Sequence, residues 1–206
     1  MMALLEYLQS RYLSEPQLLA RGNCTQEQLR HWQEQGMAPK ASYRVSMVLA
    51  CQSVLAEHQE QHYVLYYARA TPAWLRQLDR LSAGHQAFNL FHKQYKKRLK
   101  VLKKMRLCPS GCAFNAELDK HIKKEWQHFL NGTYGLCTQT GRVAEIVDKE
   151  AAIAVIDELS LAQHTDYEST QLLMSAKVLL NKACAPFPEH EYPGSSRARY
   201  LSDFAE

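Results

Sequence analysis

The residues best suited to chemistry form a run of acids and histidines between positions 117 and 128. Glu117, His121, Glu125 and His128 are spaced by four, four and three residues, so a helix over this segment places them on one face. Carboxylate and imidazole at Glu-x-x-His spacing can share one metal ion, as in helical di-iron sites. Those sites need a second contributing pair, and the sequence has no second Glu-x-x-His. We therefore expect a hydrated polar face rather than a metal site here.

The second set of reactive residues is built on cysteine. Cys108, Cys112, His128 and Cys137 have the ligand types of a Cys3His zinc site. The three residues between the first two thiols and the full helix before Cys137 depart from the usual zinc spacing, so no metal and no other cofactor is predicted. No Cys-His-Asp arrangement surrounds Cys137, which leaves the catalytic residues, if any exist, unassigned.

A glycine-containing segment, Asn131 to Cys137, follows this helix. Its two glycines lie three residues apart and bring the backbone close to other groups. One interpretation is a pocket lined by Glu125, His128, Tyr134 and Cys137. The other is a tight turn between helices that is packed by Tyr134.

Positive charge is concentrated in residues 93–106, which hold eight lysines or arginines and no acid. The whole chain has 25 basic and 21 acidic residues, so the remainder has 17 against 21 and is net acidic. A helix over this segment directs the lysines away from its apolar stripe. The basic patch can contact phosphate or an acidic partner, or it is a solvated helix face. Its members are Lys96, Lys97, Lys100, Lys103 and Lys104.

Two short helices with clear start and stop signals are predicted near the N-terminus. Ser14 to Gln17 and Thr25 to Gln28 both read as capping boxes. Gly22-Asn23 and Gly36 tolerate the left-handed conformation that ends a helix. Two helices this close together predict a helix-turn-helix.

The rest of the chain is also predicted to be helical, which makes the fold class all-α. The 206 residues are 46% hydrophobic and include only eight glycines and seven prolines. The predicted domains are the module 1–45, a helical bundle 46–182 and an irregular tail 183–206. The bundle helices are expected at 46–68, 71–82, 84–106, 114–130, 142–162 and 168–182.

Residues 12–45 resemble the N-terminal module of MerR-type regulators. The matching features are the capped first helix, the glycine-containing turn, Leu29-Arg30-His31-Trp32, Gly36-Met37, Pro39 and Tyr43-Arg44. In such a module the second helix enters the major groove N-terminus first. That placement predicts base reading by Gln26 and Gln28, and phosphate contacts from Arg30, His31, Lys40 and Arg44. Retention of the module for contact with a protein is the alternative.

The whole chain also resembles a bacterial family of uncharacterised proteins sometimes labelled natural-product biosynthesis proteins. The residues that carry this resemblance are Glu125-Trp126, Phe129-Leu130, Gly132 to Thr138 and Ser195-Ser196-Arg197.

Our leading prediction is a cytoplasmic regulatory or accessory protein that is not an enzyme. Its helix-turn-helix contacts DNA or a protein, and its bundle serves in sensing or in forming a homodimer. The alternative is a helical enzyme or ligand-binding protein of small-molecule biosynthesis. No stretch has the length of apolar residues that a membrane span requires.

Overall fold

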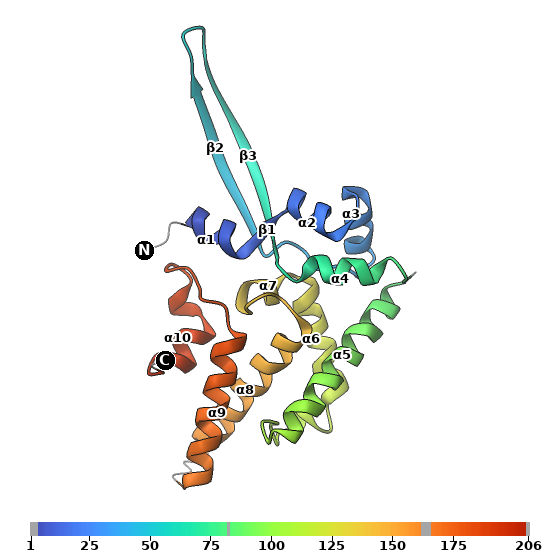
Figure 1. The fold of residues 1–206 in the computed structure, drawn as a ribbon, viewed down its shortest axis with the longest axis vertical. Coiled ribbons are helices and arrows are strands. Elements are labelled where there is room, and N and C mark those ends of the chain that lie inside the picture. The colour runs from blue at the N-terminus through green and yellow to red at the C-terminus, as the bar shows by residue number, and fades with distance from the viewer. Residues whose placement is uncertain (1–3, 82, 162–165, 205–206) are drawn as a thin grey trace.

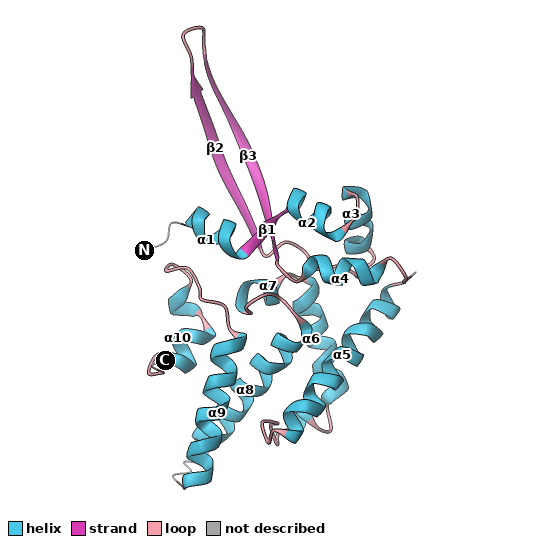
Figure 2. Cartoon of the chain, in the orientation of Figure 1, coloured by secondary structure: helices cyan, strands magenta, loops and turns pink. Residues whose placement is uncertain are grey.

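A computed structural model of the protein describes residues 4–81, 83–161 and 166–204. Short helices and a small sheet form the N-terminal part, and longer helices pack beneath them (Figure 1). A two-stranded ribbon projects away from both parts (Figure 2). None of the helices in the described ranges is long and apolar enough to cross a membrane.

The N-terminal part begins with α1 (Leu4–Arg11), β1 (Tyr12–Ser14), α2 (Glu15–Gly22) and α3 (Gln26–Glu34). The capping signals act as predicted at α3. The Thr25 hydroxyl accepts the Gln28 N–H at 3.1 Å, and the Gln28 side chain accepts the Thr25 N–H at 2.8 Å. Asn23 ends α2 in the left-handed conformation, with φ of 53°. Two adjacent helices joined by a short turn therefore occupy the predicted positions.

The chain is mostly helical, as predicted, but it is not all-α, because it also contains a three-stranded sheet. The helix expected at 46–68 is instead a hairpin of β2 (Tyr43–Gln52) and β3 (Glu57–Ala68). The two strands pair antiparallel from Tyr43 with Tyr66 out to Gln52 with Glu57, and β1 joins the other edge of β3. The strand order is β1-β3-β2, and the predicted domain boundary at residue 45 falls inside β2.

The remaining chain is helical, as predicted. The long helices are α4 (Thr71–Leu78), α5 (Gly84–Lys104), α6 (Leu118–Leu130), α8 (Val143–Leu161) and α9 (Tyr167–Ala183). Short helical turns lie between and after them. These are η1 (Cys112–Phe114), α7 (Thr133–Cys137), η2 (Tyr192–Gly194) and α10 (Ser196–Leu201).

The tail expected to be irregular thus contains helical turns, and it is tied to the rest of the protein. The Arg197 guanidinium donates to the carbonyl oxygens of Asn181 and Ala185. Earlier in the tail, Glu191 accepts a hydrogen bond from the Tyr43 hydroxyl at 2.6 Å. This bond joins the tail to the base of the hairpin.

One continuous apolar core joins the N-terminal helices to the bundle. Trp32 from α3 and Trp74 from α4 belong to the same buried cluster as the bundle residues. Trp74 lies 5.9 Å from Trp126 and 5.0 Å from Phe129 between ring centroids. Phe91 lies 5.2 Å from Trp126. Because these aromatic rings come both from α4 and from the bundle helices α5 and α6, α4 is packed rigidly against the bundle.

Candidate functional site

A groove with polar groups on both walls lies between α3 and the hairpin. It measures about 730 Å³ and is walled by Gln26, Arg30 and Gln33 on one side and by Arg44, Tyr63 and Tyr67 on the other. The Arg44 guanidinium lies 4.5 Å from the centre of the Tyr63 ring, in a cation–π contact that orients it. The structure therefore brings Arg30 and Arg44 from separate elements to one groove.

The basic side chains that were predicted to contact phosphate are accessible to a phosphate group. The fold fixes the backbone at these positions and leaves the side chains exposed. The residues are Arg30, His31, Lys40 and Arg44. Within the part of the chain that the structure describes, none of the four side chains pairs with an acid. Three unpaired cations on or near α3, which are Arg30, Lys40 and Arg44, favour an anionic partner.

The two glutamines predicted to read bases already have partners inside the protein. Gln28 closes the capping box at the start of α3, so its amide oxygen is engaged. Gln26 donates its amide to Glu15 at 2.7 Å, and the Tyr67 hydroxyl donates to the same carboxylate at 3.2 Å. Base reading by either side chain would require these bonds to break.

The basic patch on α5 is only partly unpaired. Lys96 forms an ion pair with Asp119 at 2.8 Å, so it is not part of a free cationic face. Nearby, Arg98 makes a bidentate pair with Asp148 at 2.6 and 2.9 Å. The exposed lysines that remain are Lys93, Lys97, Lys100, Lys103 and Lys104. Helix α5 leads away from the groove toward the opposite end of the protein (Figure 1).

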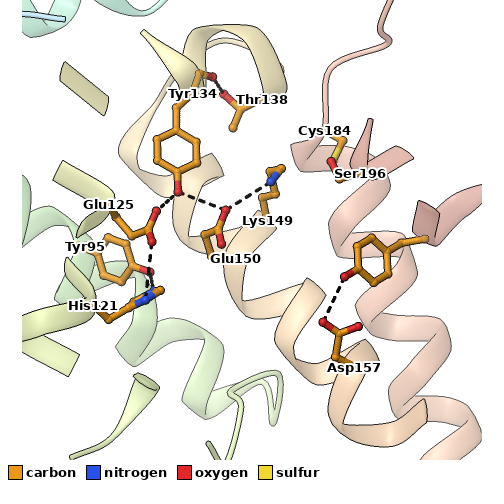
Figure 3. A network of polar contacts seen from close by, with 11 residues as sticks. Tyr95, His121, Glu125, Tyr134, Thr138, Lys149, Glu150, Asp157, Cys184 and Ser196 are labelled. Atoms are coloured by element: carbon orange, nitrogen blue, oxygen red, sulfur yellow. Dashed lines mark hydrogen bonds and ion pairs between the residues drawn. The ribbon is translucent and has the colours of Figure 1, made fainter. Parts of the chain in front are cut away.

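A buried polar network joins α5, α6, α7 and α8 (Figure 3). The Tyr134 hydroxyl donates to Glu125 and also lies 3.2 Å from a carboxylate oxygen of Glu150. Lys149 lies 3.3 Å from that same oxygen. On the other side, His121 lies 3.7 Å from Glu125 and 3.0 Å from the Tyr95 hydroxyl.

Two carboxyl groups of this network lie close to the same phenol. A phenol has a single hydrogen, so Tyr134 can donate to only one of Glu125 and Glu150. Lys149 stabilises the charged form of Glu150. Burial, and then the charge of Glu150, raise the pKa of Glu125 to about 7. Glu125 is therefore protonated below about pH 7 and ionised above it.

The hydrated face predicted for 117–128 is thus wrong at Glu125, which is only 3% exposed. His128 does meet Tyr134, ring edge to face, at 6.2 Å between centroids. Burial is also the main cause that raises the pKa of Cys137 to about 11, which keeps its thiol protonated and unreactive. Of the predicted pocket, Glu125, His128 and Tyr134 lie together, but Tyr134 is as buried as Glu125.

Sequence reasoning did not select Lys149, Glu150 or Tyr95. A usable signal existed for the first two, because they are adjacent charges in the largely apolar helix α8. A charge in such a helix is buried only with a partner. For the metal hypotheses, no group of three or more His, Cys, Asp or Glu side chains within 4–81, 83–161 and 166–204 is placed to hold an ion.

Comparison with known proteins identifies the helical part of the chain. Residues 87–206 match a family described as "Family of unknown function (DUF6058)". The chain belongs to the DUF6058 family. The DUF6058 match begins within α5 and includes the whole buried network, whereas α1 to α4 and the sheet lie before it. Neither a curated protein nor a solved structure matches the chain.

Proposed function

We propose that this protein is a cytoplasmic regulator that binds double-stranded DNA through a MerR-like winged helix-turn-helix. In this proposal α3 enters the major groove and the base of the β2–β3 hairpin is the wing. The observation that carries the proposal is the groove that Arg30 of α3 and Arg44 of β2 both line. The acid of this groove, Glu15, accepts from Gln26 and Tyr67, and neither arginine forms an ion pair with it.

The order of elements supports the same proposal. Helix, turn, helix and antiparallel hairpin follow one another as in the MerR-type modules that residues 12–45 resemble. A helix in the major groove and a hairpin beside it straddle one phosphate strand, which is where two guanidiniums are most useful.

The expected binding is weak in sequence preference and sensitive to salt. Because Gln26 and Gln28 are engaged within the module, phosphate contacts supply most of the affinity. With two to four such contacts, we expect the logarithm of the binding constant to fall against the logarithm of salt with a slope of about −2 to −4.

Fluorescence anisotropy with a labelled random-sequence duplex over a salt series tests this proposal. The double change Arg30→Ala and Arg44→Ala should flatten the slope by about 2 and weaken binding at low salt. The matched control is Lys97→Ala with Lys100→Ala, which removes the same charge from exposed positions on α5. The control should bind as the wild type does.

Two results would contradict the proposal. One is equal binding by the wild type and the groove variant. The other is loss of binding only in the α5 control, which would move the nucleic-acid contact to the basic patch.

The alternative of a biosynthetic enzyme with its site at Glu125 and His128 has less support. Glu125 and Tyr134 are each 3% exposed, so a substrate would reach them only after the packing around them opened. The closed network fits a structural role for the buried proton better than turnover.

A further inference from the structure

The outer edge of strand β2 has no neighbouring strand in the part of the chain that the structure describes. The sheet order is β1-β3-β2, so β2 pairs only with β3. Beyond its base, where β1 also joins β3, the ribbon has two strands and projects away from the helices (Figure 2). Two strands alone are marginally stable in water, and an open strand edge is a template for another strand. The ribbon would therefore be stabilised by a further strand along one edge.

The two edges of the ribbon differ in charge. Strand β3 carries Glu57 and Glu60, and charged side chains on an edge strand oppose its pairing with another chain. Residues 45–52 of β2 contain no charged residue and no proline. Two apolar side chains of this segment, Val48 and Leu49, are 56% and 53% exposed. The open edge of β2 thus lacks the features that keep an edge strand from pairing.

The hydrogen bonds of the hairpin indicate which residues of β2 face outward. The Ser53 N–H donates to the Ala56 carbonyl oxygen at 3.0 Å across the turn. Because the bonds of an antiparallel pair alternate, the odd-numbered residues of β2 bond to β3, and the even-numbered residues direct their N–H and C=O groups outward. The residues that present this row of backbone donors and acceptors are Arg44, Ser46, Val48, Ala50 and Gln52.

The sequence of β2 is complementary to itself in the antiparallel direction. When two copies pair about Val48, this residue meets the partner's Val48 on one face of the sheet. On the other face Met47 meets the partner's Leu49, so apolar side chains contact one another on both faces. Arg44, the one charged residue of β2, meets the partner's uncharged Gln52, so no like charges are opposed.

From these observations we infer that the protein forms a two-fold symmetric dimer in which the β2 strands of two copies pair antiparallel about Val48. The two ribbons then form one four-stranded sheet, with about ten hydrogen bonds between the β2 strands. This places the dimer contact on the ribbon and not on the helical bundle, where we expected it from the sequence. The dimer does not rest on the proposed DNA binding, because a single chain already contains the whole groove.

The two ends of the paired ribbons also match. Antiparallel pairing brings the tip of each ribbon to the base of the other. The tip carries two exposed apolar residues, Val54 and Leu55. At the base, α1 packs on the ribbon through Tyr7, and this helix has two exposed apolar residues of its own, Leu4 and Leu5. The dimer thus brings the apolar tip of one copy toward the apolar helix of the other.

Sedimentation velocity of the full chain in reducing buffer, at protein concentrations from about 1 to 100 µM, tests the inference. We expect a species with twice the mass of one chain at the upper concentrations. Val48→Lys should weaken self-association by at least about tenfold, because two lysines would meet at the two-fold axis. Gln61→Lys is the matched control and should remain dimeric. It adds the same charge to the same face of the ribbon, at the exposed residue of β3 that pairs with Val48.

A mixture of the Val48→Lys and Val48→Glu proteins tests the register of the two strands. Each protein alone should be monomeric, and the mixture should recover the dimer, because a lysine then faces a glutamate across the axis. Both variants should keep the circular dichroism spectrum of the wild type, since Val48 is exposed in the single chain. Arg30→Ala should weaken DNA binding and leave the dimer intact, so the two proposals can fail separately.

Three results would overturn the inference. The first is a wild type that stays monomeric at about 100 µM. The second is a Val48→Lys protein that associates as strongly as the wild type or the Gln61→Lys control. The third is a mixture of the two Val48 variants that stays monomeric.

Discussion

Replacement of Glu125 by glutamine should make the protein more stable in mildly alkaline solution and leave it nearly unchanged in acid. Burial is the main reason that the pKa of Glu125 rises from 4.5 to about 7 in the folded protein. The folded state therefore keeps a proton that the unfolded chain releases. The contribution of this group to stability is complete below about pH 4.5 and is lost as pH rises through about 7.

The size of the effect follows from the same two values. At 1.36 kcal/mol for each pKa unit, the difference between 4.5 and about 7 corresponds to about 3 kcal/mol of stability lost above pH 7. Glutamine resembles the protonated carboxyl in shape and can donate to Tyr134, but it does not ionise. The free energy of unfolding of Glu125→Gln should equal that of the wild type near about pH 4 and exceed it by up to about 3 kcal/mol near about pH 8.

Urea denaturation followed by far-ultraviolet circular dichroism, at a series of pH values, measures this difference. Titrating groups that do not contact Glu125 are present in both proteins, so their effects cancel in the comparison. Glu189→Gln is the control, because it removes an exposed carboxylate from the tail and should give a difference that does not vary with pH. A Glu125→Gln variant that is less stable than the wild type in alkaline solution, or a constant difference, would refute the reasoning.

Three further changes test the packing of the fold by denaturation. Trp32→Ala, at a side chain only 8% exposed in the core, should cost about 3–5 kcal/mol, and a midpoint equal to that of the wild type would remove Trp32 from the core. Arg98→Ala leaves Asp148 partly buried without its cation and should cost about 2–3 kcal/mol, whereas the double change with Asp148→Ala should recover part of the loss. Gly132→Ala should cost about 2 kcal/mol or more, because φ is 80° and the added Cβ would lie 2.8 Å from the Lys40 carbonyl oxygen; an unchanged stability would mean that the turn adapts.

Local signals in the sequence were sufficient for most helices. The capping residues at Ser14 and Thr25 predicted the starts of α2 and α3, and the stripe of Phe91, Tyr95 and Leu99 predicted the buried face of α5. These patterns succeed because each depends on residues within one or two turns of the same helix.

The hairpin could not be predicted in the same way. Its turn, residues 53–56, is Ser-Val-Leu-Ala, without the glycine, asparagine or proline that marks a tight hairpin. Residues 48–63 are exposed on both faces of the ribbon. Their sequence therefore lacks the alternation of apolar and polar residues that marks a strand with one buried face. The strand structure depends on the pairing of β2 with β3 and of β3 with β1.

The candidate sites show the same difference between features that depend on local sequence and features that depend on tertiary packing. The sequence assigned Glu125 and Tyr134 to one candidate pocket, but the contact of Tyr134 with Glu150 depends on how α8 packs between its neighbours. The internal partners of Gln26 and Gln28 likewise appear only in three dimensions.

The hairpin is a long element that a short connection joins to the helical part of the protein. Strand β3 has 12 residues and is about 40 Å long, and only Arg69 and Ala70 separate it from α4. The Ala70 N–H donates to the Thr140 carbonyl oxygen at 2.8 Å and ties this connection to the loop before α8. A rotation of about 3° at this connection displaces the ribbon tip by about 2 Å. The direction of β3 at its base, which β1 and the Ala70 bond fix, thus sets the position of the ribbon tip.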